Sequence, residues 1–238
     1  MAGLPELLDL NCDLGEGIAG TDELIPWITS ANICCGEHAG SEEQIQRTLA
    51  RAVEHNVVIG AHPGHTDREH FGRRPLEISE RQLAELLSNQ VGQLKAWAQQ
   101  QGGALRYLKL HGALYHQANQ VPELAEMTLQ FCSINQLALV CPPNGQLMVL
   151  GKLYPSVQLA PEGFADRLYD QKFQLVSREN PGAIISDVEV SLRQLEQLTN
   201  HFQIRTLCVH GDHPGSESFL MTLRQALLDR NIRLESFV

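Results

Sequence analysis

Short apolar runs, rich in β-branched residues, end repeatedly in a polar motif that contains glycine or lies next to it. The seven motifs are residues 11–17, 36–40, 60–64, 109–112, 142–145, 162–167 and 210–212. Polar residues that recur just past strand ends are typical of a parallel α/β barrel or sheet, which builds one site from many loops. The pattern therefore predicts an enzyme with a single composite active site.

Segments with helical periodicity alternate with these apolar runs. The expected strands are 7–12, 28–34, 57–61, 107–110, 137–141, 157–160, 206–209 and 232–237. The expected helices are 41–54, 79–102, 124–132, 146–153, 188–202 and 216–230, the first two opening with capping boxes. No linker or charge block interrupts the alternation, so we expect one domain over residues 1–238, a TIM-like (β/α) barrel of about seven strands. The long irregular stretches 62–76 and 162–187 are expected to be lids or substrate contacts.

The chain is acidic, with 28 Asp and Glu against 18 Lys and Arg and a net charge of −10. Nucleic acid and anionic membranes bind basic surfaces, so we expect neither as a partner. No run reaches the roughly 18 apolar residues of a membrane span, and no secretory signal is visible at the start. The six cysteines form no Cys-x-x-Cys pair, so we expect them to be reduced core residues of a cytoplasmic protein.

Asp13 and Glu16 lie three residues apart where the first strand breaks into a loop. One could act as a general base while the other orients a partner or binds a cation. An ordinary turn also uses Asp and Gly in this way. The recurrence of polar residues at other strand ends favours the functional interpretation.

Four histidines, His38, His62, His111 and His210, follow four apolar runs and lie within two residues of a glycine. Histidine exchanges protons near pH 7, and four at strand ends indicate a site where one alone would indicate a structural role. We expect at least two of them in the site, and the sequence leaves open whether all four belong to it. Such groups could also hold Zn²⁺ or Fe²⁺, but no His-x-His, His-Glu-x-x-His or EF-hand pattern is present, so a divalent metal stays open.

Charged residues flank two of these histidines and fill the sixth motif. Lys109 and His111 are two apart, so a strand would point both into the barrel mouth. By the same argument Asp212 could orient His210. An anionic small-molecule substrate is predicted by Arg73 and by Arg167 with its neighbours in the sixth motif, because arginine binds carboxylates and phosphates.

The usual phosphate-binding sequences are absent from the chain. It has no Gly-x-x-x-x-Gly-Lys-Ser/Thr loop, no Gly-x-Gly-x-x-Gly after a strand, and no Gly-x-Ser-x-Gly elbow. If a nucleoside triphosphate drives the chemistry, we do not expect this chain to bind it alone.

Over about residues 9–214, the chain resembles the LamB/YcsF family. The segments that carry the resemblance, taken in order, are 11–16, 31–40, 59–64, 71–74, 109–115, 162–167 and 208–212. The resemblance implies a barrel similar to the glycoside hydrolase/deacetylase barrels. It also implies a role as one component of an ATP-dependent 5-oxoprolinase. This hydrolase opens the cyclic amide of 5-oxo-L-proline to give L-glutamate, together with partner subunits B and C. The chain departs from the family pattern at Glu37 and His65.

The residues and the resemblance together assign roles. The expected catalytic residues are Asp13, His38, His62, Lys109, His111 and Asp212, and the expected substrate-binding residues are Asn11, Glu16, Arg73, Glu162, Asp166, Arg167 and His210. Asp13 or a histidine is the expected base, Lys109 with backbone N–H groups the oxyanion stabiliser, and Arg167 the anion clamp. ATP is expected to lie largely on the partner subunits.

Two alternatives stay open. The first is a metal-dependent deacetylase or amidohydrolase on the same barrel, in which Asp13 and two histidines hold the ion. The second is a binding subunit that only completes a complex. The sequence also leaves open whether the chain forms a homo-oligomer.

Overall fold

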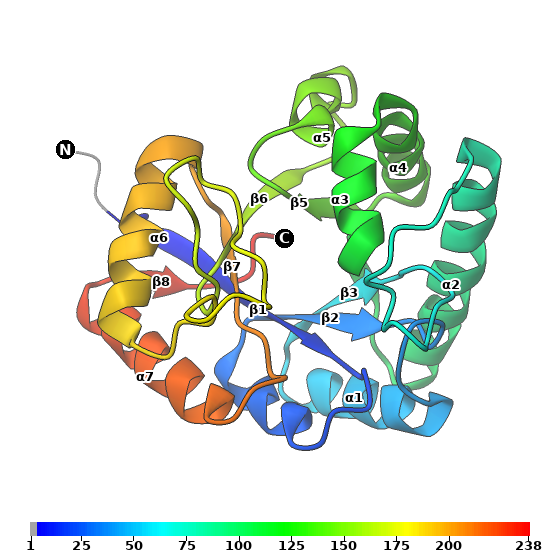
Figure 1. The fold of residues 1–238 in the computed structure, drawn as a ribbon. Helices are drawn as coiled ribbons and strands as arrows, with labels where there is room; N and C mark the ends of the chain where they lie inside the picture. The colour runs from blue at the N-terminus through cyan, green and yellow to red at the C-terminus, as the bar shows by residue number, and fades with distance from the viewer. Residues whose placement is uncertain (1–3) are drawn as a thin grey trace.

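The computed structural model describes residues 4–238, whose strands form a parallel barrel (Figure 1). The strands are β1 (Leu7–Leu14), β2 (Ser30–Cys34), β3 (Val58–His62), β4 (Leu105–Lys109), β5 (Ala138–Cys141), β6 (Leu159–Phe164), β7 (Thr206–Cys208) and β8 (Arg233–Leu234). Each strand from β2 to β6 pairs with the strand that follows it in sequence, and β1 pairs with both β2 and β7, which closes a seven-stranded ring. β8 pairs in addition with Leu7 and Leu8 at the start of β1. The predicted TIM-like α/β barrel is confirmed.

Helices surround the barrel (Figure 1). They are α1 (Glu42–Glu54), α2 (Glu80–Gln100), α3 (Gly112–Gln120), α4 (Pro122–Asn135), α5 (Gln146–Leu150), α6 (Val188–Phe202) and α7 (Ser216–Asp229), with 3-10 turns η1 (Thr21–Trp27) and η2 (Gly151–Leu153). The capping boxes at Ser41 and Ser79 are present, as predicted. No helix within the described residues is both long and apolar enough to cross a membrane.

The strand predicted at 232–237 is limited to β8, the helix predicted at 146–153 divides into α5 and η2, and η1 was not predicted. Two further differences bear on the site. Helix α3 was not expected; it begins directly after His111, where Gly112 has a φ of 54° that a side chain would strain. The predicted strand 157–160 runs instead from Leu159 to Phe164, because Glu162 to Phe164 pair with β7. Glu162 therefore lies within a strand rather than after one.

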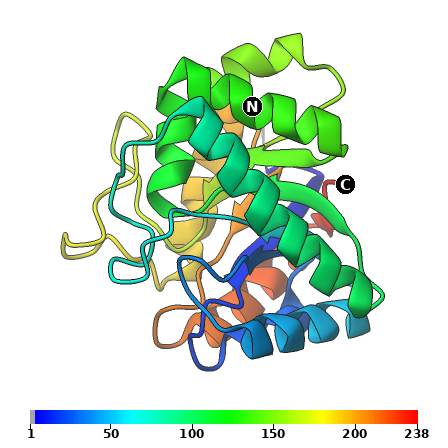
Figure 2. The same ribbon diagram turned by 90° about the vertical axis from the view of Figure 1, so that its right-hand side faces the viewer.

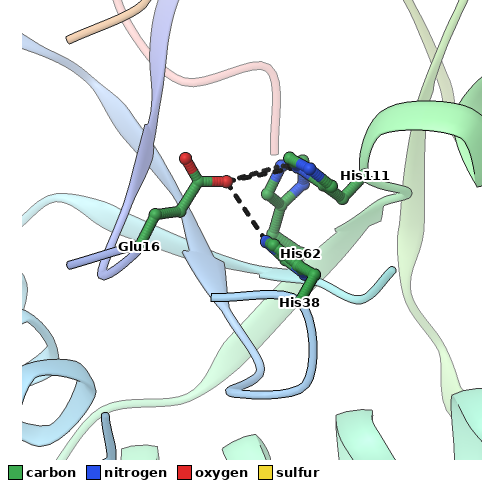
Figure 3. A group of neighbouring side chains, drawn as sticks. All are labelled: Glu16, His38, His62 and His111. Atoms are coloured by element: carbon green, nitrogen blue, oxygen red, sulfur yellow. Dashed lines mark hydrogen bonds and ion pairs between the residues drawn. The ribbon is translucent and has the colours of Figure 1, made fainter. Parts of the chain in front are cut away.

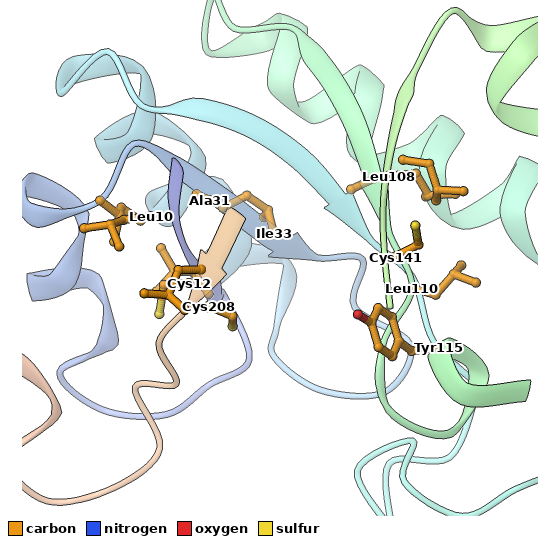
Figure 4. Packing of buried hydrophobic residues seen from close by; sticks show 14 of the residues in the cluster. Leu10, Cys12, Ala31, Ile33, Leu108, Leu110, Tyr115, Cys141 and Cys208 are labelled. Carbon is orange, nitrogen blue, oxygen red and sulfur yellow. The ribbon is translucent and has the colours of Figure 1, made fainter. Parts of the chain in front are cut away.

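Strand β1 shows how the barrel divides polar from apolar side chains. Leu8, Leu10 and Cys12 belong to the large apolar cluster between strands and helices, part of which Figure 4 shows. The alternating residues Asp9 and Asn11 instead hydrogen bond to side chains of other strands. All six cysteines are buried and unpaired, as the sequence predicted.

The barrel interior has an apolar part and a polar part. Tyr107, Ala138, Val140, Ala160 and Phe237 form a separate apolar cluster, in which the rings of Tyr107 and Phe237 lie 5.2 Å apart. The C-terminal segment therefore closes part of the interior with an aromatic ring. Polar side chains of β1, β2, β4, β6 and β7 occupy the rest.

Asp9 is fully buried in this polar part, and burial raises its pKa to about 6. A carboxyl whose pKa is higher in the folded than in the unfolded chain loses its stabilising contribution as pH rises, here between about pH 4 and 6. The shift of about two pKa units corresponds to about 3 kcal/mol. Urea unfolding of the native chain and of Asp9→Asn across this range should show a pH-dependent difference of that size. An equal pH dependence in both chains would contradict the prediction.

Two long connections project from the same end of the barrel. Figure 2 shows the loop between β3 and α2 and the loop between β6 and α6 extending on one side of the molecule. These are the irregular stretches expected from the sequence. They follow the carboxyl ends of their strands, where α/β barrels carry their sites.

Candidate active site

A cavity of about 740 Å³ lies at this end of the barrel. Its walls contain most of the residues predicted for the site, namely Asp13, Glu16, His62, Arg73, Lys109, His111, Arg167, His210 and Asp212. The remaining predicted residues, Asn11, His38, Glu162 and Asp166, have no exposed surface and contact the wall residues from behind. Residues distant in sequence therefore meet around one cavity.

Lys109 is buried at the base of the cavity, with 3% of its surface exposed. Its Nζ lies 2.9 Å from Oδ1 of Asp13, 2.8 Å from Oε1 of Glu162 and 3.4 Å from Oδ1 of Asn11. Burial alone would lower the pKa of Lys109, but these carboxylates outweigh it and raise the pKa well above its ordinary value. An ammonium group has three hydrogens. All three are directed at protein acceptors, so the contacts place Lys109 as a support for Asp13.

Asp13 presents one carboxylate oxygen to the protein interior and one to the histidines. Oδ1 accepts hydrogen bonds from Lys109 and from Nδ2 of Asn32, at 2.7 Å. Oδ2 lies 3.3 Å from Nε2 of His62. Burial would raise the pKa of Asp13, but His62 and Lys109 hold it well below its ordinary value. Asp13 is therefore ionised across the physiological pH range.

Glu16 joins three histidines (Figure 3), one of which, His62, also contacts Asp13. Its Oε1 lies 3.2 Å from Nε2 of His38, 3.2 Å from Nδ1 of His111 and 3.8 Å from Nε2 of His62. Burial would raise the pKa of Glu16, but the contacts with His111 and His38 lower it below its ordinary range. The ring of His38 stacks on that of His111 with centroids 3.8 Å apart. Three of the four predicted histidines thus form one cluster.

His210 lies in the same cavity but has a different partner from the one predicted. Its Nδ1 is 2.9 Å from Oδ1 of Asp166, and its backbone N–H donates to Oδ2 of Asp166 at 3.2 Å. Asp212 instead accepts hydrogen bonds from Arg73, at 3.1 Å, and from Arg178. The expected orientation of His210 by Asp212 is wrong. β7 ends at Cys208, so the same-side rule for residues two apart in a strand does not apply here.

Lys109 and His111 both reach the cavity, as predicted, but the two side chains contact different residues there. Lys109 is the last residue of β4 and points toward Asp13. His111 is the N-cap of α3, and its Nδ1 lies 2.9 Å from Nε2 of His62.

Three arginines, Arg73, Arg167 and Arg178, also line the cavity. Among the described residues, the buried Nε of Arg167 has no hydrogen-bond partner, while its NH2 group donates to the carbonyl oxygen of Val176 at 2.8 Å. Burial and nearby Arg178 lower the pKa of Arg167. A bound anion would relieve both effects, because it supplies an acceptor and an opposite charge.

Sequence reasoning missed three residues of the site. Asn32 holds Asp13, Tyr115 donates to Oε2 of Glu162 at 2.8 Å, and Arg178 pairs with Asp212. The polar residues at alternate positions of β2, Ser30 and Asn32, are a signal that could have revealed the first. Arg178 lies in an irregular loop and has no comparable signal.

A sequence profile of the LamB/YcsF family matches residues 8–238. The chain belongs to the LamB/YcsF family. It is 35% identical to the A subunit of 5-oxoprolinase from Vibrio cholerae, covering 92% of this chain and 97% of that protein. It is 37% identical to the A subunit of 5-oxoprolinase from Brevibacillus brevis, covering 95% and 96%. The crystal structure of a lactam utilization protein from Thermus thermophilus superposes with a TM-score of 0.85 at 30% identity, covering 97% of this chain and all of that one.

Proposed function

We propose that this chain is the A subunit of an ATP-dependent 5-oxoprolinase, which hydrolyses 5-oxo-L-proline to L-glutamate together with subunits B and C. The observation that carries the proposal is the cavity itself, which is lined by an ionised carboxylate, Asp13, and by a cation, Arg167. A small molecule with a carboxylate and an amide carbonyl fits this polarity. The names of the relatives from Vibrio cholerae and Brevibacillus brevis support the same substrate.

The contacts suggest a role for each wall. The substrate carboxylate would accept hydrogen bonds from Arg167, which lines the cavity. The lactam carbon would then lie toward Asp13, which would take a proton from an attacking water as the C–N bond opens. Lys109 and Asn32 would hold Asp13 in place. The proton would return to the ring nitrogen as it leaves, so that one water is added across the amide bond.

The ATP-dependent part would be shared with the partners. An amide is a poor electrophile, and transfer of the γ-phosphoryl group of ATP to its oxygen, with release of ADP, would activate the ring carbon. Attack of the first water and departure of the ring nitrogen would then leave an acyl phosphate, which a second water would hydrolyse to glutamate and inorganic phosphate. The chain has none of the usual phosphate-binding loops. We therefore assign ATP largely to subunits B and C.

The test is turnover of 5-oxo-L-proline by the purified chain mixed with the candidate B and C subunits of the same organism. We expect glutamate to form only when ATP and all three chains are present. No glutamate from the complete mixture would refute the proposed function. Hydrolysis by this chain alone, without ATP, would favour the metal-dependent amidohydrolase instead.

Arg167→Met tests the proposed carboxylate clamp. Charged hydrogen bonds contribute about 1.5–3 kcal/mol, so the KM for 5-oxo-L-proline should rise about 10- to 100-fold while kcat changes little. Steady-state kinetics of the three-subunit mixture gives both constants. Arg74→Met is the matched control, because Arg74 is largely exposed and lies 3.6 Å from Asp67. An unchanged KM in Arg167→Met would place the substrate carboxylate elsewhere.

A further inference from the structure

Three imidazole nitrogens and one carboxylate oxygen converge at the wall of the cavity (Figure 3). They belong to Glu16, His38, His62 and His111, and all lie within 4.8 Å of one another. Nε2 of His62 lies 2.9 Å from Nδ1 of His111. Oε1 of Glu16 lies 3.2 Å from the nearest nitrogen of His38, 3.2 Å from that of His111 and 3.8 Å from that of His62. Four ligands at about 2.0–2.1 Å from one zinc ion lie about 3.3 Å apart in a tetrahedral site. The spacing of the four side chains therefore agrees with coordination of a single ion.

Backbone carbonyl groups fix the orientation of two of the rings. Nδ1 of His62 lies 2.8 Å from the carbonyl oxygen of Lys109, and Nε2 of His111 lies 2.9 Å from that of Phe71. A carbonyl oxygen only accepts, so these two nitrogens carry the hydrogens. A histidine that binds a metal usually donates its other N–H to a carbonyl or carboxylate in this way.

The same hydrogen bonds leave two lone pairs facing each other. In the neutral rings, Nε2 of His62 and Nδ1 of His111 carry no hydrogen, yet they lie only 2.9 Å apart. Two lone pairs at this distance repel unless a proton or a cation lies between or beside them. The carboxylate of Glu16 adds a negative charge at 3.2 Å from Nδ1 of His111. The cluster is therefore built to hold positive charge.

His38 supplies the third imidazole. It has no exposed surface, so its ring nitrogens face the protein interior and not solvent. Its Nε2 faces Glu16, and its ring is held by stacking on His111. Neutral imidazole is the form that binds metal ions.

A second group in the cavity has suitable atoms but the wrong electrostatics. Asp13, Cys208 and His210 also offer ligand atoms within 4.8 Å of one another. However, Nζ of Lys109 lies 2.9 Å from Oδ1 of Asp13 and 3.3 Å from Sγ of Cys208. The ammonium group already occupies this position and would repel a metal ion.

We propose that Glu16, His38, His62 and His111 form a binding site for one divalent transition-metal ion, with Zn²⁺ as the type. Three imidazoles and a carboxylate are ligands that suit zinc and its neighbours. Glu16, His62 and His111 also line the cavity, so the ion would lie at the cavity wall. Its use in lactam hydrolysis rests on the proposed function, whereas its binding does not.

The test uses the chain by itself, stripped of metal with a chelator and then titrated with Zn²⁺ or Co²⁺. Elemental analysis after desalting should give one ion per chain, and Co²⁺ should give the intense visible bands of a four-coordinate ion. His62→Ala, His111→Ala and the isosteric Glu16→Gln should each weaken Zn²⁺ binding at least about 100-fold. His210→Ala is the matched control from the other group and should bind like the native chain. Circular dichroism of the metal-free variants checks that each is folded.

The outcomes separate the metal site from the proposed function. The site would be overturned if the native chain bound no stoichiometric Zn²⁺. It would also be overturned if folded His62→Ala and His111→Ala bound Zn²⁺ as tightly as the native chain does. Either result would favour a hydrogen-bonded imidazole pair. Loss of binding in His210→Ala alone would overturn it in favour of the second group. An ion bound as described, in a chain that gives no glutamate with subunits B and C, would refute only the proposed function.

Discussion

Replacement of Lys109 by methionine is expected to lower the free energy of unfolding by about 3–5 kcal/mol, because it leaves buried carboxylates without their cation. Asp13 and Glu162 lie 2.9 Å and 2.8 Å from its Nζ, and Glu162 has no exposed surface. Methionine fills similar space without charge. Urea denaturation followed by the fluorescence of Trp27 and Trp97 measures the loss.

The pH dependence of this loss identifies its cause. Without Lys109, burial should raise the pKa of Asp13 in the folded chain, because one of the cations that lower it is gone. A carboxyl with a raised folded-state pKa stabilises the fold only while protonated, so the deficit of Lys109→Met should grow as pH rises through that pKa. A deficit that is independent of pH would show that lost packing, and not uncompensated charge, destabilises the variant.

A double variant supplies the control. Lys109→Met combined with Glu162→Gln removes one of the uncompensated charges and keeps the shape of the side chain. Directly contacting charged residues couple by about 0.5–3 kcal/mol, so the double variant should be more stable than the sum of the single changes by that amount. Simple additivity would mean that Lys109 and Glu162 do not interact energetically.

The barrel could be predicted from the sequence because its signals are local and repeat along the chain. Capping boxes at Ser41 and Ser79 and apolar strand runs need only neighbouring residues. Helix α3 was missed because it opens with glycine and follows a strand without a loop. The polar interior was missed because the strands were identified only as short apolar runs. In β1, Asp9, Asn11 and Asp13 alternate with the apolar residues.

The residues of the site could be predicted more reliably than their pairings. Strand ends of a parallel barrel meet at one rim, so His62, Lys109 and His210 were expected near one another from position alone. Which carboxylate contacts which cation depends on turn geometry that no short-range pattern encodes. His210 therefore pairs with Asp166, 44 residues away, rather than with its near neighbour Asp212. Arg178 reaches Asp212 from a long loop for the same reason.

Asp13→Asn is expected to reduce turnover by the three-subunit mixture about 10²- to 10⁴-fold, the usual contribution of a general base. The amide is nearly isosteric with the carboxylate, and its oxygen can still accept from Asn32 and Lys109. It cannot take a proton from water. The loss should therefore appear in kcat, with a KM for 5-oxo-L-proline close to that of the native complex. Initial rates of glutamate formation at saturating ATP measure both constants.

Asp229→Asn makes the same chemical change at the exposed last residue of α7 and should leave turnover unchanged. Size-exclusion chromatography of each variant with subunits B and C separates lost catalysis from lost assembly. If Asp13→Asn assembles and keeps turnover within about threefold of native, well below the effect of a general base, Asp13 is not the base. The base would then be a histidine of the cavity or a group on the partner subunits. A large fall in kcat with normal assembly would instead place the hydrolytic step in this barrel.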